Sequence, residues 1–157
     1  MSRVHHSVIE PISAFDASQL TTSLVAAIGD KTSARLNQHM GVMLQDGGVY
    51  PSARVGEVVD HYCALFGNRM VAKDLVERVG LTHRQSSTWR RLSGGEKQRL
   101  SLALALAAKP DIAFLDEPTA VLTPQETDDL FATLRLAIAE GLSIIFISHK
   151  LHEVMAI

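Results

Sequence analysis

Two acidic residues that follow a short apolar run are the side chains of this sequence best suited to chemistry. Asp116 and Glu117 come directly after Ile112–Leu115, which has the length and composition of a buried strand. One carboxylate in this position can hold a hard cation such as Mg²⁺ beside a nucleotide, and its neighbour can orient or deprotonate an attacking water. An ordinary acidic turn closed by Pro118 is the alternative, and the pair alone does not choose between the two.

A pair of glycines lies upstream, at the start of a helix rich in alanine and leucine. Ser93 and Glu96 flank Gly94 and Gly95, and a serine followed three residues later by a glutamate is a capping box. That interpretation does not explain two adjacent glycines, which cost helix stability and are best justified where the backbone must approach a ligand. Free N–H groups and the positive end of the helix dipole bind phosphate. We therefore interpret the motif as a phosphate-binding helix start.

Polar residues also follow two other predicted strands. Gln45 follows Gly41–Leu44, and His149 closely follows Ser143–Ile147. In an open parallel sheet the ligand lies beyond the carboxyl ends of the strands, so these side chains are expected to gather at one edge with the two carboxylates. His149 is either a hydrogen-bonded histidine at a strand end or a donor to a terminal phosphate.

The rest of the chain supplies the helices that must position these groups. The pattern predicts a helix capped by Ser52, a second from about Met70 to Val79, and a long one from the glycine pair to Lys109-Pro110. An amphipathic helix over Pro124–Ala139, stopped by Gly141, separates the last two strands. Alternating strands and helices predict an α/β fold with a parallel sheet.

Composition limits the class of protein. A chain of 157 residues has room for one ordinary domain, and its net charge of -2 argues against a nucleic-acid partner. The single Cys63 excludes an intrachain disulfide and suits a reducing compartment. The beginning of the chain has no apolar stretch typical of a signal peptide, and the most apolar helix, Leu100–Ala108, is far shorter than the ~20 residues that span a bilayer.

Together these motifs resemble the ATP-binding-cassette (ABC) superfamily. Leu92–Leu100 is similar to its signature motif and Ile112–Glu117 to its Walker B strand, while Gln45 matches the Q-loop glutamine and His149 the switch histidine. All four occur in the family's order. The resemblance implies an α/β fold: a three-layer P-loop NTPase-like core with a small helical subdomain.

The resemblance also implies residue roles, with ATP and Mg²⁺ as cofactors. Glu117 would be the catalytic base, His149 would contact the γ-phosphate, Asp116 would help hold Mg²⁺, and Gln45 would contact the metal and the water. A further set would bind the nucleotide of a partner across a dimer interface: Ser93, Gly94, Gly95 and Gln98. The partners implied are transmembrane permease subunits and a second ABC ATPase, which places the protein on the cytoplasmic face of the plasma membrane.

We expect the ABC-like part to span 41–157, with the helical subdomain at about 52–108 and the Walker B and switch region at 111–157. Residues 1–40 form a segment of unclear structure. In the family, the helical subdomain is the part that docks on the permease.

The phosphate loop of the family, G-x-x-x-x-G-K-[ST], is the missing motif. Gly29-Asp30-Lys31-Thr32 is the nearest approach, but the two required glycines fall on Val25 and Asp30. A β-carbon and a carboxylate would then face the phosphate. We expect a truncated or rearranged ATPase subunit that is nearly inactive alone and acts with a partner's nucleotide.

Two other functions compete with this expectation. One is a non-catalytic regulatory module that docks on the permease without hydrolysing ATP, and the lowest ranked is a ribosome-associated relative. The direction of transport stays open. Thr119–Glu126 looks like sugar or nucleoside importers, with Thr123 where the family usually has aspartate, whereas Trp89–Leu104 looks more like drug exporters.

Overall fold

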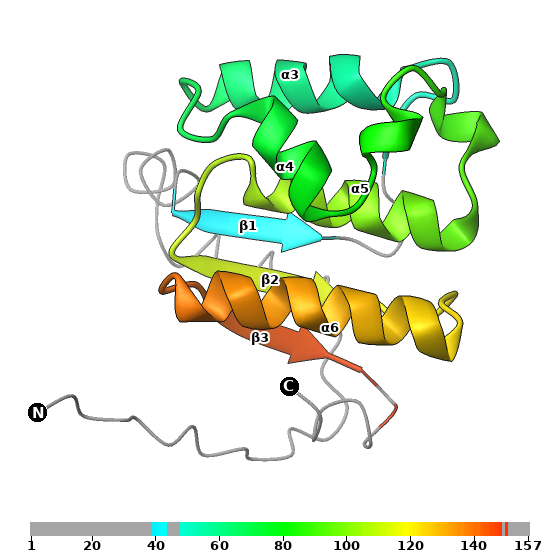
Figure 1. Ribbon diagram of the computed structural model, residues 1–157. Helices are drawn as coiled ribbons and strands as arrows, with labels where there is room; N and C mark the ends of the chain where they lie inside the picture. The colour runs from blue at the N-terminus through cyan, green and yellow to red at the C-terminus, as the bar shows by residue number, and fades with distance from the viewer. Residues whose placement is uncertain (1–38, 44–47, 149, 151–157) are drawn as a thin grey trace, which may run out of the picture.

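The computed structural model describes residues 39–43, 48–148 and 150 (Figure 1). Several predictions fall on other residues and lie outside the described part. They concern the near-match to the phosphate loop at Gly29–Thr32, the Q-loop residue Gln45 and the switch residue His149.

In the part of the chain that the structure describes, three parallel strands form one sheet. They are β1 (Met40–Met43), β2 (Ile112–Asp116) and β3 (Ser143–Ile147), hydrogen-bonded in the order β1-β2-β3. Asp116 lies in register with Ile147, so the carboxyl ends of β2 and β3 are level. The prediction of a parallel sheet is confirmed, and Figure 1 shows all three arrows pointing to the same end of the molecule.

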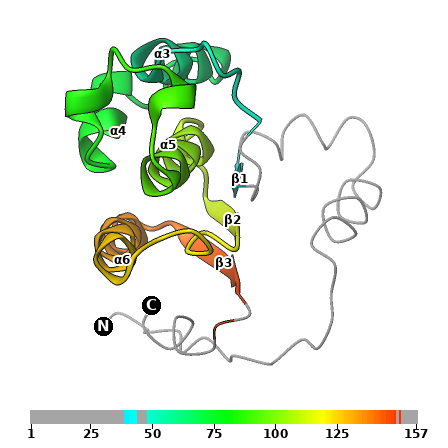
Figure 2. The same cartoon turned by 90° about the vertical axis from the view of Figure 1, so that its right-hand side faces the viewer.

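Within the described residues, four α-helices and two short 3₁₀ turns accompany the sheet. Their bounds are α3 (Val55–Leu65), α4 (Ala72–Arg78), η1 (Thr82–Arg84), η2 (Trp89–Arg91), α5 (Gly94–Leu106) and α6 (Pro124–Ala139). Seen along the strands, α5 and α6 lie on the same side of the sheet, and α3 and α4 lie beyond α5 (Figure 2). The bounds of α6 and β3 agree with the prediction to the residue.

The start of α3 differs from the prediction. Arg54, not Ser52, is the N-cap residue, and no side chain caps the helix. The reason is a long-range pairing: Arg54 is extended and forms a β-bridge with Thr88, and the Trp89 amide donates to the Ala53 carbonyl at 2.9 Å. These contacts hold the chain in an extended conformation past the expected start.

Helices α4 and α5 are shorter than predicted. Helix α4 begins after an extended Val71, and α5 ends at Leu106 rather than at Lys109-Pro110. The residue before a proline is disfavoured in the α region, and Lys109 takes the left-handed conformation with φ of 50°. Its amide donates to the Leu106 carbonyl at 2.9 Å, which closes the helix end.

Helix α5 is the centre of the core. Most of its residues are buried, including the whole run Leu100–Leu106. Such burial on all sides is expected for a helix packed between other helices and a sheet. At Gly41 in β1 an added β-carbon would overlap the Ala105 carbonyl oxygen, so strand and helix backbones touch directly. This packing brings the start of α5 to the end of the molecule where the strands terminate (Figure 1).

Candidate functional site

The end of β2 carries the two predicted carboxylates. Asp116 is the last residue of the strand and is half-buried. Glu117 turns the chain sharply with φ of 46°, and its amide donates to the Ile147 carbonyl of β3 at 2.9 Å. A left-handed conformation at a non-glycine residue costs about 1–3 kcal/mol and persists only where the surroundings enforce it. The fold therefore fixes the acidic pair firmly at the sheet edge.

A compact loop joins this edge to α6. The Ala120 amide donates to the Glu117 carbonyl at 3.1 Å, and the Leu122 amide donates to the Thr119 carbonyl at 3.2 Å. Thr119 is fully buried, and its carbonyl oxygen accepts a hydrogen bond from Lys150 Nζ at 3.3 Å. The loop thus consists of two consecutive turns around the buried Thr119, and Lys150 contacts its backbone.

The start of α5 is a complete capping box. Ser93 Oγ accepts from the Glu96 amide at 3.1 Å, and Glu96 Oε2 accepts from the Ser93 amide at 2.8 Å. This confirms the capping interpretation of the serine and the glutamate. Two amides at the helix start are satisfied in this way, and the helix axis is fixed relative to the preceding turn.

An ion pair, in addition to the capping box, holds the Glu96 side chain in place. It is only 6% exposed, and its Oε1 accepts from Arg84 Nε at 2.7 Å. Burial alone would raise the pKa of this carboxyl, but the Ser93 amide, the Arg84 guanidinium and the nearby Arg99 outweigh burial and lower it. Glu96 is therefore ionised at neutral pH.

The two glycines are explained by packing within the chain. A β-carbon on Gly95 would overlap the Glu126 carboxylate, and one on Gly94 would lie 3.3 Å from Val121 Cγ2. The sequence argument justified both glycines by the approach of a ligand. The structure supplies a different reason, since the loop before α6 and the first turn of that helix lie directly on the start of α5.

A second capping box, which the sequence analysis missed, forms the start of α6. Glu126 Oε2 accepts from the Thr123 amide and from the Thr123 hydroxyl, both at 3.0 Å, and the Glu126 amide donates to Thr123 Oγ1 at 3.3 Å. The Thr123 amide is the largest cause of a lowered pKa at Glu126, followed by the hydroxyl, and Arg99 adds to them. The signal was present, because Thr-x-x-Glu repeats the pattern recognised at Ser93.

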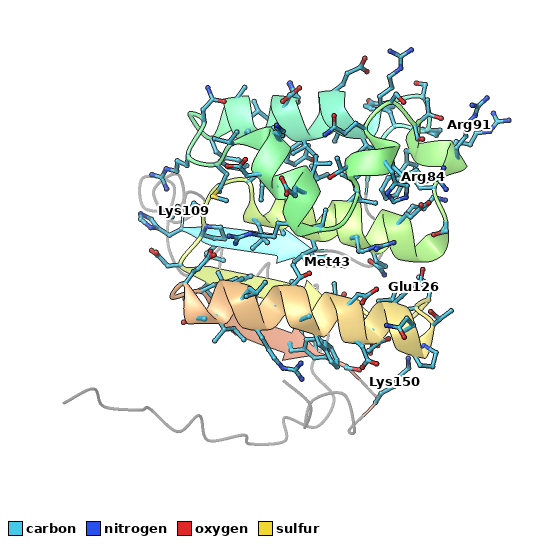
Figure 3. The ribbon with its side chains drawn as sticks, viewed as in Figure 1. Met43, Arg84, Arg91, Lys109, Glu126 and Lys150 are labelled. Carbon is cyan, nitrogen blue, oxygen red and sulfur yellow. The ribbon has the colours of Figure 1, made fainter. Side chains whose placement is uncertain are left out.

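The predicted site residues fall into three groups. Asp116 and Glu117 lie at the carboxyl edge of the sheet. Within α5 and its cap, Ser93 and Gly94 are exposed whereas Gly95 and Gln98 are buried. Gln45 and His149 lie outside the described residues. Figure 3 places Arg84, Glu126 and Lys150 at the strand-terminal end of the molecule and Lys109 at the opposite end.

The two carboxylates at the sheet edge suit a cation whose other ligands come from a bound molecule or from water. Among the described residues no group of three or more His, Cys, Asp or Glu side chains could hold a metal ion. Asp116 and Glu117 offer carboxylate oxygens, the ligand type that Mg²⁺ prefers, and Mg²⁺ commonly binds through one or two carboxylates together with phosphate oxygens and water. The donor set fits a nucleotide-bound Mg²⁺ and does not form a complete protein cage.

The fold and the sheet edge define a broad class. A parallel sheet with carboxylates at a strand end is the arrangement of an open α/β protein that binds its ligand beyond the carboxyl ends of its strands, and it agrees with the P-loop NTPase-like core of the proteins that match this chain. The sequence profile of the ABC transporter family matches residues 13–120, which extends into the N-terminal segment. The chain belongs to this family.

Individual relatives agree. The chain is 31% identical over 123 residues to TcyN, the ATP-binding protein of an L-cystine transport system in Escherichia coli (strain K12), covering 74% of this chain and 49% of that protein. It is 30% identical over 129 residues to LnrL, a linearmycin resistance ATP-binding protein of Bacillus subtilis (strain 168), covering 79% of this chain and 42% of that protein.

A solved structure of an ABC transporter in an inward-facing conformation matches with a TM-score of 0.67 and 25% sequence identity. The match covers 76% of this chain and 52% of that one. The chain thus spans about half the length, or less, of the proteins that it matches. Within the part of the chain that the structure describes, no helix has the length and apolar character needed to cross a membrane.

Proposed function

We propose that the chain is an ATP-binding and ATP-hydrolysing subunit of an ABC membrane transporter that acts on a nucleotide held largely by a partner ATPase. The observation that carries the proposal is the position of the acidic pair. The left-handed turn at Glu117 and its bond to Ile147 hold two carboxylates at the level where β2 and β3 end. Membership of the family supports a nucleotide bound at this edge.

Each side chain then has a role. Glu117 accepts a proton from the attacking water, and Asp116 helps to hold Mg²⁺. When bound, Mg²⁺ neutralises charge on the phosphates. Gln45 contacts the metal and the water, and His149 contacts the γ-phosphate. Both of these roles rest on the family resemblance.

The signature helix acts in trans. Ser93 and Gly94 are exposed at the start of α5, so a partner's phosphate can approach them. Gly95 and Gln98 are buried, which suits a supporting role beneath the contact surface. Helices α3 and α4 form the subdomain that docks on the permease, at the cytoplasmic face of the membrane.

The test measures nucleotide binding and partner binding separately. Purified chain is titrated with ATP and Mg²⁺ by equilibrium dialysis, and we expect no saturable binding in the micromolar range because no phosphate loop of the required pattern occurs in the sequence. Micromolar affinity that survives Lys31→Ala would contradict the proposal. Co-purification with ABC permease and ATPase subunits from the same cells tests the assembly.

Glu117→Gln then tests hydrolysis in the reconstituted assembly. We expect this variant to remove the ATPase activity of the sites that contain this chain, with Asp128→Asn, an exposed carboxylate on α6, as the matched control. A second function, a regulatory module that occupies the permease without hydrolysis, is favoured by the missing phosphate loop. It predicts normal co-purification and no effect of Glu117→Gln.

A further inference from the structure

The Glu126 side chain lies between the two halves of the proposed site. Glu126 hydrogen-bonds the Thr123 amide and hydroxyl at the start of α6, and its carboxylate packs on Gly95 at the start of α5. The capping role explains the first contact. It does not explain why the same carboxylate lies so close to a glycine of the other helix that any larger residue there would overlap it.

The charges around Glu126 support a fixed position. Arg99 of α5 attracts both Glu126 and Glu96, and the two carboxylates repel each other. The Nε of Arg99 is buried and forms no hydrogen bond within the described part of the chain. One guanidinium therefore acts on the capping carboxylates of two helices, while Arg84 and the His83 ring contact Glu96.

The connection from Glu126 back to Glu117 is short and constrained. The loop between Glu117 and Thr123 consists of the two turns closed at Ala120 and Leu122, and Thr119 is buried within it. Such a loop has little freedom to absorb a displacement of the start of α6.

We propose that Glu126 is a positioning residue that couples the signature helix, through its contact with Gly95, to the loop that carries Glu117. In this arrangement, a displacement at the start of α5 on binding a partner reaches the acidic edge of the same chain through Glu126. The functional meaning of this coupling rests on the proposed function, but the contact itself is testable without nucleotide.

A mutant cycle on the full chain tests the contact. Gly95→Ala places a β-carbon against the Glu126 carboxylate, so we expect it to lower the urea midpoint of unfolding in the wild-type background. Glu126→Ala removes the carboxylate that the new β-carbon would overlap. In that background Gly95→Ala should leave the urea midpoint unchanged or raise it, because alanine favours a helix more than glycine. Asp128→Ala, which removes a carboxylate from α6 without touching Gly95, is the control background and should not relieve the loss.

Amide chemical shifts in the same variants test the coupling. Gly95→Ala should move the Glu117 and Ala120 amide signals in the wild-type and Asp128→Ala backgrounds and leave them in place in the Glu126→Ala background. A residue that only caps α6 would not produce this pattern. Transmission that persists without Glu126, or signals that never move, would overturn the proposal.

If the Gly95→Ala variant does not fold, the double variant tests whether the contact with Glu126 is the cause. Recovery of folding in Gly95→Ala with Glu126→Ala supports the contact, and failure to recover overturns it. Because no nucleotide is used, a negative result removes the coupling and leaves the proposed function to its own test with partner subunits.

Discussion

The same four-residue motif starts α5 and α6, but the two helix starts differ in what surrounds the glutamate. At α5, Glu96 is buried and ion-paired with Arg84. At α6, Glu126 is partly exposed, bonds its own cap residue, and packs on the first helix. A capping box thus sets where a helix begins, while the surroundings decide whether its carboxylate stabilises the core or connects two elements.

Replacing Glu96 should have the largest effect on stability. Glu96→Ala removes the acceptor for the Ser93 amide and leaves Arg84 without its ion-pair partner, so we expect a loss of about 2–3 kcal/mol in the free energy of unfolding. Urea denaturation measures this loss. Glu96→Gln keeps an acceptor oxygen and should lose less. An equal loss for Glu96→Ala and Glu126→Ala would remove the contrast between the two helix starts.

Loss of the cap hydroxyl should also cost more stability at the start of α5 than at the start of α6, although the difference should be smaller than for the two glutamates. Ser93→Ala leaves the buried Glu96 amide without its acceptor and should cost about 1–1.5 kcal/mol, whereas Thr123→Ala at the more exposed start of α6 should cost about 0.5–1 kcal/mol. Urea denaturation again supplies the values. Thr127→Ala, which removes a hydroxyl bond to the Thr123 carbonyl, serves as the control for loss of a threonine in the same turn.

The pH dependence of stability should also separate the two glutamates. Both have lowered pKa values in the folded protein, so their stabilisation is complete above the ordinary glutamate pKa and is lost as the pH falls through the lower folded value. We expect the free energy of unfolding to decline below about pH 5. Glu96→Gln should flatten this decline more than Glu126→Gln, because solvent screens the more exposed carboxylate. A steeper effect of Glu126→Gln would contradict the assignment.

Local signals were sufficient to predict α6 and β3. Pro124 at the first helical position and the stop at Gly141 define the helix without help from the rest of the chain, and Gly141 indeed has φ of 102°. The start of α3 could not be predicted in this way. It depends on the pairing of Arg54 with Thr88, which are far apart in the sequence.

The candidate site also combines positions that local sequence signals predict with a contact that they do not. The positions of Asp116 and Glu117 followed from an apolar strand and the rule for parallel sheets, both local in the sequence. The contact of Glu126 with Gly95 depends on how α6 packs on α5, and no spacing rule gives that distance. The sequence could therefore indicate that the glycines admit something close to the backbone but not that this something is a side chain of the same protein.

The smallest effect should come from the ion pair at the other end of α6. Arg78 Nη2 lies 2.6 Å from Glu140 Oε1, a shorter distance than that from Arg84 Nε to Glu96 Oε1, yet Glu140 is exposed. A pair with an exposed carboxylate gains little, because water solvates both charges in the unfolded chain and screens the carboxylate in the folded one. Glu140→Gln should leave the urea midpoint of unfolding unchanged within experimental error. Any small difference from the wild type should disappear at high salt concentration. A loss comparable to that of Glu96→Gln would mean that distance, and not burial, determines what a carboxylate contributes in this protein.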